Sequence, residues 1–252
     1  MKRYITNPPF SDSILKTVLF SSRHFASSAA TAPLDLEDDI GGFTGASFGG
    51  IIQDKDLLRK TPNGLYVLGL IDNGAMDPNA TLYNQLLKRC TQLGRLKEGR
   101  LVHAHVLNSS YRNYVAVQNS IINMYAKCGS PVEARKVFDE MAERDMVSWT
   151  AVITGFSQND RAQEALGLSV AMLRDGFVPN QSTLGSVLKA ATAVGEMEGR
   201  QIHAVCLKSG HGDDVYVGSA LVDMYAKCGQ MEEAKVVFDG LMSKNEVCWN
   251  AL

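Results

Sequence analysis

The sequence predicts an all-α fold, a superhelical solenoid of helix-turn-helix repeats of 31–35 residues that is preceded by a disordered N-terminus. Two observations predict it. The segment "MYAKCG" occurs at Met124–Gly129 and again at Met224–Gly229, one hundred residues later, and its neighbours repeat with it. Within each hundred residues, a finer period carries apolar side chains at helical spacing. Hairpins of this length cannot bury their apolar stripes alone, so they stack on one another.

The first 34 residues have the composition of an organelle-targeting segment. They are rich in Ser, Thr and Ala and carry four basic residues against one acid, a balance that is typical of transit peptides. Arg23-His24-Phe25 followed by Ala26 resembles a mitochondrial processing site. We therefore expect a mitochondrial transit peptide over residues 1–25, and a plastid destination is less favoured; a merely disordered N-terminus is the alternative. The charged residues are Lys2, Arg3, Lys16, Arg23 and Asp12.

Residues 26–54 are predicted to form a disordered linker. The acidic stretch "LDLEDD" at 34–39 is followed by a Gly-rich stretch, and neither contains a helical apolar pattern. Residues 55–79, which include "LYVLGLIDNGAMDPN", fit a degenerate leading repeat less clearly than the units that follow.

Five repeat units follow, and their boundaries come from internal matches. Trp149 matches Trp249 when the sequence is compared with itself at a shift of one hundred residues. A shift of 31 residues aligns Asn123–Ala126 with Thr154–Ser157. Because the last match stops early, we expect either the N-terminal part of a longer protein or a truncated gene product. The units are 80–114, 115–145, 146–180, 181–214 and 215–245, and residues 246–252 start a truncated repeat.

Each unit is predicted to contain two helices. In unit 115–145, an apolar stripe ends at Cys128, and Gly129 then ends the helix because glycine enters the left-handed conformation at little cost. Ser130 and Pro131 start the second helix, and Glu133 is predicted to complete a capping box with Ser130. The two stripes are Ile121, Met124, Tyr125 and Cys128, then Ala134, Val137, Phe138 and Met141.

Several chemical functions are disfavoured by the sequence. The five cysteines form no Cys-x-x-Cys pair, and the histidines are scattered, so we predict neither a metal site nor a cofactor. No run of about 18 apolar residues is present, so we do not expect membrane insertion. Cys128 and Cys228 are instead predicted to be core positions at helix ends. His103 and His203 are predicted to be packing or surface residues and not ligands, and Tyr125, Phe156 and Tyr225 are predicted to be core aromatic residues.

Over residues 80–252 the units resemble pentatricopeptide repeats, in the plant class that alternates standard, long and short types. The short type is matched by "NMYAKCGSPVEARKVFDEMAERD" and "DMYAKCGQMEEAKVVFDGLMSKN", in units 115–145 and 215–245. Unit 146–180, "MVSWTAVITGFSQNDRAQEALGLSVAMLRDGFVPN", is similar to the standard type. Units 80–114 and 181–214 are similar to the long type, with "LLKRCTQLGRLKEGRLVHAHV" and "VLKAATAVGEMEGRQIHAVCLKSG". The resemblance implies a right-handed superhelix.

The resemblance also implies sequence-specific binding of single-stranded organellar RNA, one base per repeat. In the family, the fifth and last residues of a repeat read the base, and the second residue packs against its face. The implied reading pairs are Asn119 with Asp145, Thr150 with Asn180, and Ser219 with Asn245; the packing residues are Ala116, Val147 and Tyr216. With RNA running 5′ to 3′ along the repeats, units 115–145 to 215–245 are expected to prefer 5′-U-A-N-A-3′.

For these residues a structural role is the alternative interpretation. Short polar residues at helix starts are often caps, and Asp and Asn are common in turns. The long units carry Asn84 with Tyr114 and Gly185 with Asp214, which are not recognised combinations, so we expect little base discrimination there.

The charge of the repeat region leaves a second function open. Residues 80–252 contain 18 Lys and Arg and 18 Asp and Glu, so they lack the basic excess that usually marks nucleic-acid binding. A helical-repeat scaffold for a protein partner is therefore the alternative. Relatives of this class often carry a C-terminal cytidine deaminase that serves C-to-U editing, but its His-x-Glu and Cys-x-x-Cys signature is absent here. We expect a monomer that is not itself an enzyme, with editing-complex proteins as further partners.

Overall fold

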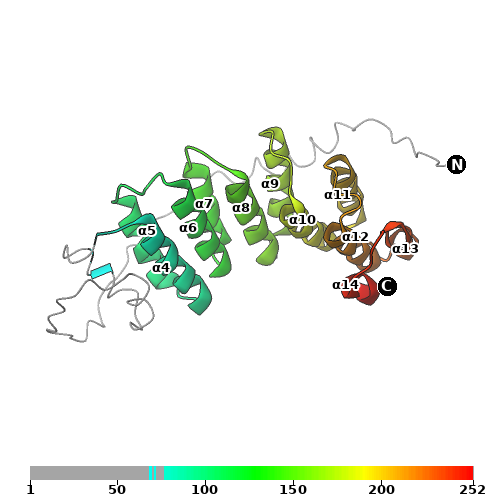
Figure 1. Ribbon diagram of the computed structural model, residues 1–252, viewed down its shortest axis with the longest axis horizontal. Helices are drawn as coiled ribbons and strands as arrows, with labels where there is room; N and C mark the ends of the chain where they lie inside the picture. The colour runs from blue at the N-terminus through cyan, green and yellow to red at the C-terminus, as the bar shows by residue number, and fades with distance from the viewer. Residues whose placement is uncertain (1–67, 70, 72–76, 252) are drawn as a thin grey trace. The chain divides into compact units, whose positions relative to one another are not determined.

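The computed structural model describes residues 68–69, 71 and 77–251, and this part of the chain is helical with short connections (Figure 1). The predicted transit peptide at 1–25 and the linker at 26–54 lie outside the described residues. So does the predicted degenerate repeat at 55–79, apart from Leu68, Gly69, Ile71 and residues 77–79. None of the helices in the described ranges has the length and apolar character needed to span a bilayer.

The helices form successive antiparallel hairpins, and the predicted all-α repeat fold is confirmed. The first helices begin at Ala80, Val115, Met146, Gln181, Val215 and Glu246, so the repeat lengths are 35, 31, 35, 34 and 31 residues. The hairpins are α4 (Ala80–Leu93) with α5 (Leu96–Leu107), α6 (Val115–Lys127) with α7 (Pro131–Glu140), α8 (Met146–Gln158) with α9 (Ala162–Arg174), α10 (Gln181–Val194) with α11 (Glu196–Lys208), and α12 (Val215–Lys227) with α13 (Met231–Gly240). The last helix, α14 (Glu246–Ala251), begins a further unit.

Stacking of the hairpins gives a solenoid with two helix layers. The first helices α4, α6, α8, α10, α12 and α14 pack against one another in chain order. Each second helix packs on its own first helix, and α5, α7, α9 and α11 also pack on the next first helix. Buried apolar side chains between the layers form two clusters that meet at α10. Each hairpin thus buries its stripe only because it has neighbours, as expected for a solenoid.

The repeated segment MYAKCG ends a first helix in both copies. The Met124 side chain packs against Gly99 of the preceding hairpin so closely that a Cβ on Gly99 would overlap the sulfur, and Met224 does the same at Gly199. This contact explains why Gly99 and Met124 recur together one hundred residues later. Gly129 has a φ of +78°, which is the predicted left-handed end of the helix.

The tyrosine of the segment contacts the second helix of the preceding hairpin. The hydroxyl of Tyr125 lies 3.0 Å from Nδ1 of His103, and the Tyr225 hydroxyl lies 3.0 Å from Nδ1 of His203. Burial lowers the pKa of both imidazoles below 6.5, although nearby Glu140 partly opposes this for His103. The predicted core position of Tyr125 and Tyr225 is confirmed, and the two histidines that they contact are half-buried.

The predicted capping box of α7 is wrong. Ser130 is the N-cap residue and Pro131 occupies the first turn, but the Ser130 side chain makes no capping hydrogen bond. Glu133 instead pairs with Arg100 of α5, at 3.2 Å between Nη2 and Oε1. The equivalent pair, Arg200 with Glu233, occurs between α11 and α13. A contact between neighbouring hairpins has therefore replaced the local cap.

The cysteines of the segment lie in apolar surroundings. Cys128 follows the last residue of α6, and its Sγ donates to the Cys90 carbonyl at 3.8 Å. Burial raises the pKa of Cys128 and Cys228, and raises that of Cys90 to about 11 and that of Cys206 to about 12. All four thiols are therefore protonated near neutral pH. This suits a packing role, because a reactive cysteine needs the thiolate form.

Candidate functional site

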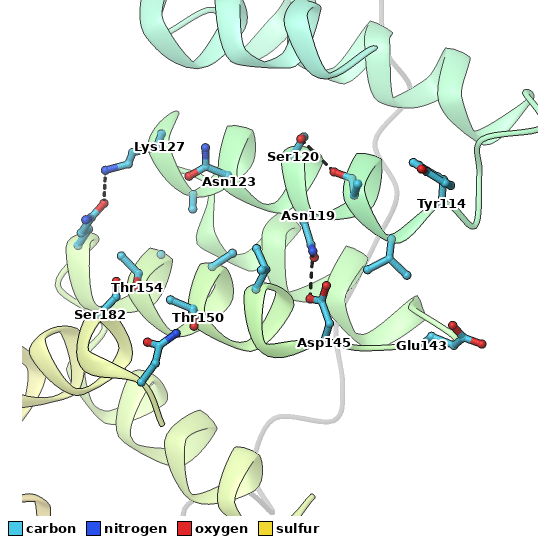
Figure 2. Close-up of a pocket in the computed structure, with 18 of the residues that line it drawn as sticks. Tyr114, Asn119, Ser120, Asn123, Lys127, Glu143, Asp145, Thr150, Thr154 and Ser182 are labelled. Carbon is cyan, nitrogen blue, oxygen red and sulfur yellow. Dashed lines mark hydrogen bonds between the residues drawn. The ribbon is translucent and has the colours of Figure 1, made fainter. Parts of the chain in front are cut away.

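A groove of about 980 Å³ runs over the layer of first helices (Figure 2). Its walls come from α6, α8 and the first turn of α10, and from the turns that precede these three helices. Six of the nine residues implied by the resemblance line it: Ala116, Asn119, Asp145, Val147, Thr150 and Asn180. Ser219, Asn245 and Tyr216 belong to the next short unit and do not line this groove.

The groove repeats its side chains with the 31-residue spacing. One helical face supplies each wall, at steps of three or four residues along α6 and again along α8. The matching pairs are Ala116 and Val147, Asn119 and Thr150, Asn123 and Thr154, and Lys127 and Gln158. Sequence reasoning missed the last two pairs, although extending the helical period beyond the fifth residue would have found them. The Lys127 ammonium donates to Oε1 of Gln158 at 2.6 Å, so the two walls are linked there.

In unit 115–145 the fifth and last residues are in direct contact. The amide of Asn119 donates to Oδ1 of Asp145 at 3.1 Å, a bond drawn in Figure 2. Asp145 is also the N-cap of α8, and it accepts from the backbone N–H and the hydroxyl of Ser148, both at 2.8 Å. Asn119 itself is only 8% exposed, and within the described residues its Oδ1 has no hydrogen-bond partner.

The same hydrogen bonds fix the charge of Asp145. Burial opposes its ionisation, but the hydrogen bonds from Ser148 and Asn119 outweigh burial and lower the pKa of the carboxyl below 3.8. Asp145 is therefore an ionised acceptor near neutral pH.

In unit 146–180 the two residues are joined through a third. Asn180 is the N-cap of α10, and its Oδ1 accepts from the backbone N–H and the hydroxyl of Thr183, both at 2.9 Å. The Thr183 hydroxyl also lies 2.8 Å from that of Thr150, which in turn lies 2.8 Å from the Met146 carbonyl. Thr183 is completely buried.

In unit 215–245 the contact is direct again. Oδ1 of Asn245 accepts from the Ser219 hydroxyl at 3.0 Å and from the Cys248 backbone N–H at 2.9 Å. Ser219 is 4% exposed. All three last residues therefore cap the next first helix, as the structural alternative predicted, and all three still contact the fifth residue of their own unit, directly or through one hydroxyl.

The second residues are exposed at the start of their helices. Val147 is 58% exposed and Tyr216 is 56% exposed, and Ala116 is exposed at the equivalent place in α6. Apolar surface of this kind is available to the flat face of a planar ligand. The Tyr216 ring also lies over Gly185, the fifth residue of unit 181–214, where a Cβ would come within 3.0 Å of the ring.

The long units differ from the others at these positions. Gly185 offers no side chain, and the Asp214 carboxylate accepts from the Val217 backbone N–H at 2.9 Å as the cap of α12. In unit 80–114, Tyr114 is 53% exposed and lines the groove beside Ala116. The exposed ring was not anticipated from the sequence, where Tyr114 is only a departure from the family pattern.

The groove is lined by both positively and negatively charged side chains, and the described residues that line it include no cluster of metal-ligating side chains. Lys127, Glu143 and Asp145 are the charged side chains that line it. Throughout the described part of the chain, no three His, Cys, Asp or Glu side chains are grouped as metal ligands would be. The arrangement suits hydrogen bonding and stacking to a neutral planar group.

Comparison with known proteins gives a consistent result. The PPR repeat family model matches residues 119–146, 147–177 and 219–245. A mitochondrial pentatricopeptide repeat-containing protein of Arabidopsis thaliana is 47% identical over 197 residues, which are 78% of this chain and 30% of that protein. A chloroplastic one is 39% identical over 178 residues, or 70% of this chain and 22% of that protein. The chain thus spans less than a third of these relatives.

Solved structures share the fold. The crystal structure of the pentatricopeptide repeat protein PPR10 from maize has a TM-score of 0.57 at 21% identity, over 74% of this chain and 28% of that chain. PPR10 in complex with an 18-nucleotide psaJ RNA element gives a TM-score of 0.55 at 22% identity, over 69% of this chain and 26% of that chain. From its repeat spacing, its hairpin fold and these matches, this chain belongs to the pentatricopeptide repeat proteins known from plants.

Proposed function

We propose that this chain binds single-stranded RNA in an organelle, with one base read by each short or standard repeat. The observation that carries the proposal is that three units repeat the same arrangement of a fifth residue, a last residue and an exposed second residue, and that two of these units line the groove. Splayed bases present a flat face and a polar edge, and these three positions offer an apolar surface and two polar groups. The complex of PPR10 with RNA supports the same class of ligand.

The hydrogen bonds of the last residues supply a physical reason for base choice. Backbone N–H groups at the helix starts must face oxygen, so Asn180 and Asn245 use Oδ1 as the cap and are left with their NH₂ donors. A donor suits N1 of adenine. Asp145 is ionised and can only accept, which suits the N3–H of uracil. The preference 5′-U-A-N-A-3′ follows for units 115–145 to 215–245.

The organelle is supported by the N-terminal composition and by the names of relatives. One relative is called mitochondrial and another chloroplastic; the segment Arg23-His24-Phe25 favours the mitochondrion. A role in RNA processing, such as C-to-U editing, is part of the proposal and rests on the family resemblance. Protein recovered from mitochondria should begin near Ala26, and N-terminal sequencing that finds Met1 in that fraction would refute the targeting.

The proposed code is tested by exchanging one reading pair. The double change Thr150→Asn with Asn180→Asp recreates the Asn119 and Asp145 pair in unit 146–180. Each correct base contact is worth about 1–3 kcal/mol by analogy with bidentate readout, so the affinity of three contacts is low and NMR titration at low salt is the suitable measurement. With oligonucleotides that vary the second base of U-A-C-A, the wild type should prefer A and the double variant U.

Two results would count against the proposal. A wild-type chain without any preference at the second base contradicts readout by this unit. A double variant that folds but still prefers A contradicts the assignment of Thr150 and Asn180. Circular dichroism should show unchanged helicity, since neither residue belongs to the apolar stripes.

A salt titration distinguishes RNA binding from the alternative of a protein scaffold. The RNA affinity should fall as the salt concentration rises, with a shallow slope because the repeat region has no net charge.

A further inference from the structure

The third residue of each first helix varies in parallel with the reading pair of the preceding unit. Ser148, Thr183 and Cys248 are polar or thiol side chains with 0% exposure, and each contacts the reading pair of the unit before it. At the equivalent place in α6 and α12 the residues are Val117 and Val217, also with 0% exposure. The valines follow the two long units, whose residue pairs are not of the reading kind.

Burying a hydroxyl at this position has a cost that a valine does not incur. A buried polar group is tolerated when its hydrogen bonds are made, and among the described residues the partners of the Thr183 hydroxyl are Asn180 and Thr150. At the equivalent site of α12, Val217 shows that an apolar side chain of similar size is accepted while its backbone N–H still donates to the capping carboxylate of Asp214, at 2.9 Å. Capping therefore does not explain why Thr183 carries a hydroxyl.

Unit 146–180 depends on this hydroxyl more than its neighbours do. In the other two units the fifth and last residues bond directly, Asn119 to Asp145 at 3.1 Å and Ser219 to Asn245 at 3.0 Å. Thr150 and Asn180 are connected instead through the Thr183 hydroxyl, at 2.8 and 2.9 Å. The Thr183 hydroxyl adds a second hydrogen bond to Oδ1 of Asn180 beside that of the Thr183 backbone N–H, so rotation of the amide would break two hydrogen bonds and not one.

We propose that Thr183 is the positioning residue for base readout by unit 146–180, so that the specificity of this unit depends on a buried residue of the next repeat. The inference rests on the proposed function, because Thr183 acts on the base through Asn180 and Thr150. Its hydroxyl holds the Asn180 amide so that the NH₂ donors are directed away from the cap. The same hydroxyl fixes the position of the Thr150 hydroxyl relative to this amide.

The test compares three variants of the full chain. Thr183→Val removes the hydroxyl and should lower the preference for A over U at the second base of U-A-C-A by about fivefold, the effect of one ordinary hydrogen bond. Preference at the first and last bases should stay within about twofold. Thr183→Ser keeps the hydroxyl and should restore the wild-type preference. Ser148→Ala removes the equivalent hydroxyl where a direct Asn119–Asp145 bond exists, and should change the preference for U by less than about twofold.

A second measurement needs no RNA. Nitrogen-15 relaxation of the Asn180 side-chain amide in the free protein should report increased mobility in Thr183→Val and wild-type order in Thr183→Ser, while the amide of Asn245 stays unchanged. If the wild type has no base preference, the proposed function fails and base readout through Thr183 fails with it, whereas a loosened Asn180 amide in Thr183→Val would still show that Thr183 orders this side chain. An unchanged Asn180 amide, an equal loss at all three bases, or a serine variant that resembles the valine variant would overturn the positioning role.

Discussion

Single residues at the unit boundaries cap helices in this protein, and the proposed function gives them a second role. Asp145, Asn180 and Asn245 each use one oxygen to cap the following helix, and the capping bond decides which polar atoms remain for the groove. A capping role and a reading role are therefore compatible for the same side chain. The choice between Asp and Asn leaves the cap in place and changes only whether the free group donates or accepts.

The capping role of the Asp145 side chain can be tested by mutation. Asp145→Ala removes the N-cap of α8 and should lower the free energy of unfolding by about 1 kcal/mol, because Ala cannot accept from the Ser148 N–H. Asp145→Asn keeps the acceptor and should stay within about 0.5 kcal/mol of the wild type. Urea denaturation at pH 7 measures both. Equal destabilisation by Ala and Asn would mean that the carboxylate charge, and not the cap, stabilises α8.

Sequence reasoning succeeded for residues whose role depends on helical period and failed where the partner is distant. Met124, Tyr125 and Phe138 were predicted as core residues because apolar side chains at three- and four-residue steps share one helix face. Glu133 was assigned to a local cap, yet its partner Arg100 lies in the preceding hairpin. Thr183 was overlooked for the same reason, since its contact with Thr150 joins two repeats and has no local pattern.

At the scale of helices, the junction between a long and a short unit should be sensitive to pH. His103 and His203 each contact a tyrosine hydroxyl of the next first helix, and burial lowers the pKa of both below 6.5. As the pH is lowered, these two histidines therefore become protonated in the unfolded chain at a higher pH than in the folded chain. Stability is complete above pH 6.5 and should decrease as the pH falls from 6.5 through the folded pKa values. Urea unfolding at pH 7.5, 6.5 and 5.5 measures the decrease.

A double variant identifies the groups responsible for this pH dependence. Changing both His103 and His203 to Gln keeps a polar partner for Tyr125 and Tyr225 but removes the titrating groups. The variant should lose most of the dependence between pH 7.5 and 5.5 while remaining folded at pH 7.5. If its stability still declines as steeply as that of the wild type, other groups control the pH response.

For the whole molecule, the repeat architecture makes stability a sum over neighbouring hairpins, so the ends should open before the middle. The two tryptophans report on this difference. Trp149 is 3% exposed, with its ring centroid 4.7 Å from that of Phe138 and 6.3 Å from that of Phe177. Trp249 is the equivalent residue of α14, lies 4.8 Å from Phe238, and is 63% exposed. One tryptophan is therefore enclosed by its neighbours and the other is covered on part of its surface.

Single-tryptophan variants of the 252-residue chain turn this difference into a measurement. Trp249→Phe leaves Trp149, whose emission should be blue-shifted and weakly quenched by acrylamide, whereas Trp149→Phe leaves a red-shifted, readily quenched Trp249. During urea unfolding, the signal of Trp249 should change at lower urea than that of Trp149, and hydrogen exchange should be faster in residues 215–245 than in 115–145. Far-UV circular dichroism of each variant serves as the control, because its transition should follow Trp149. Coincident transitions of both fluorescence signals, with equal exchange protection in the two short units, would mean that the hairpins unfold as a single cooperative unit despite their linear arrangement.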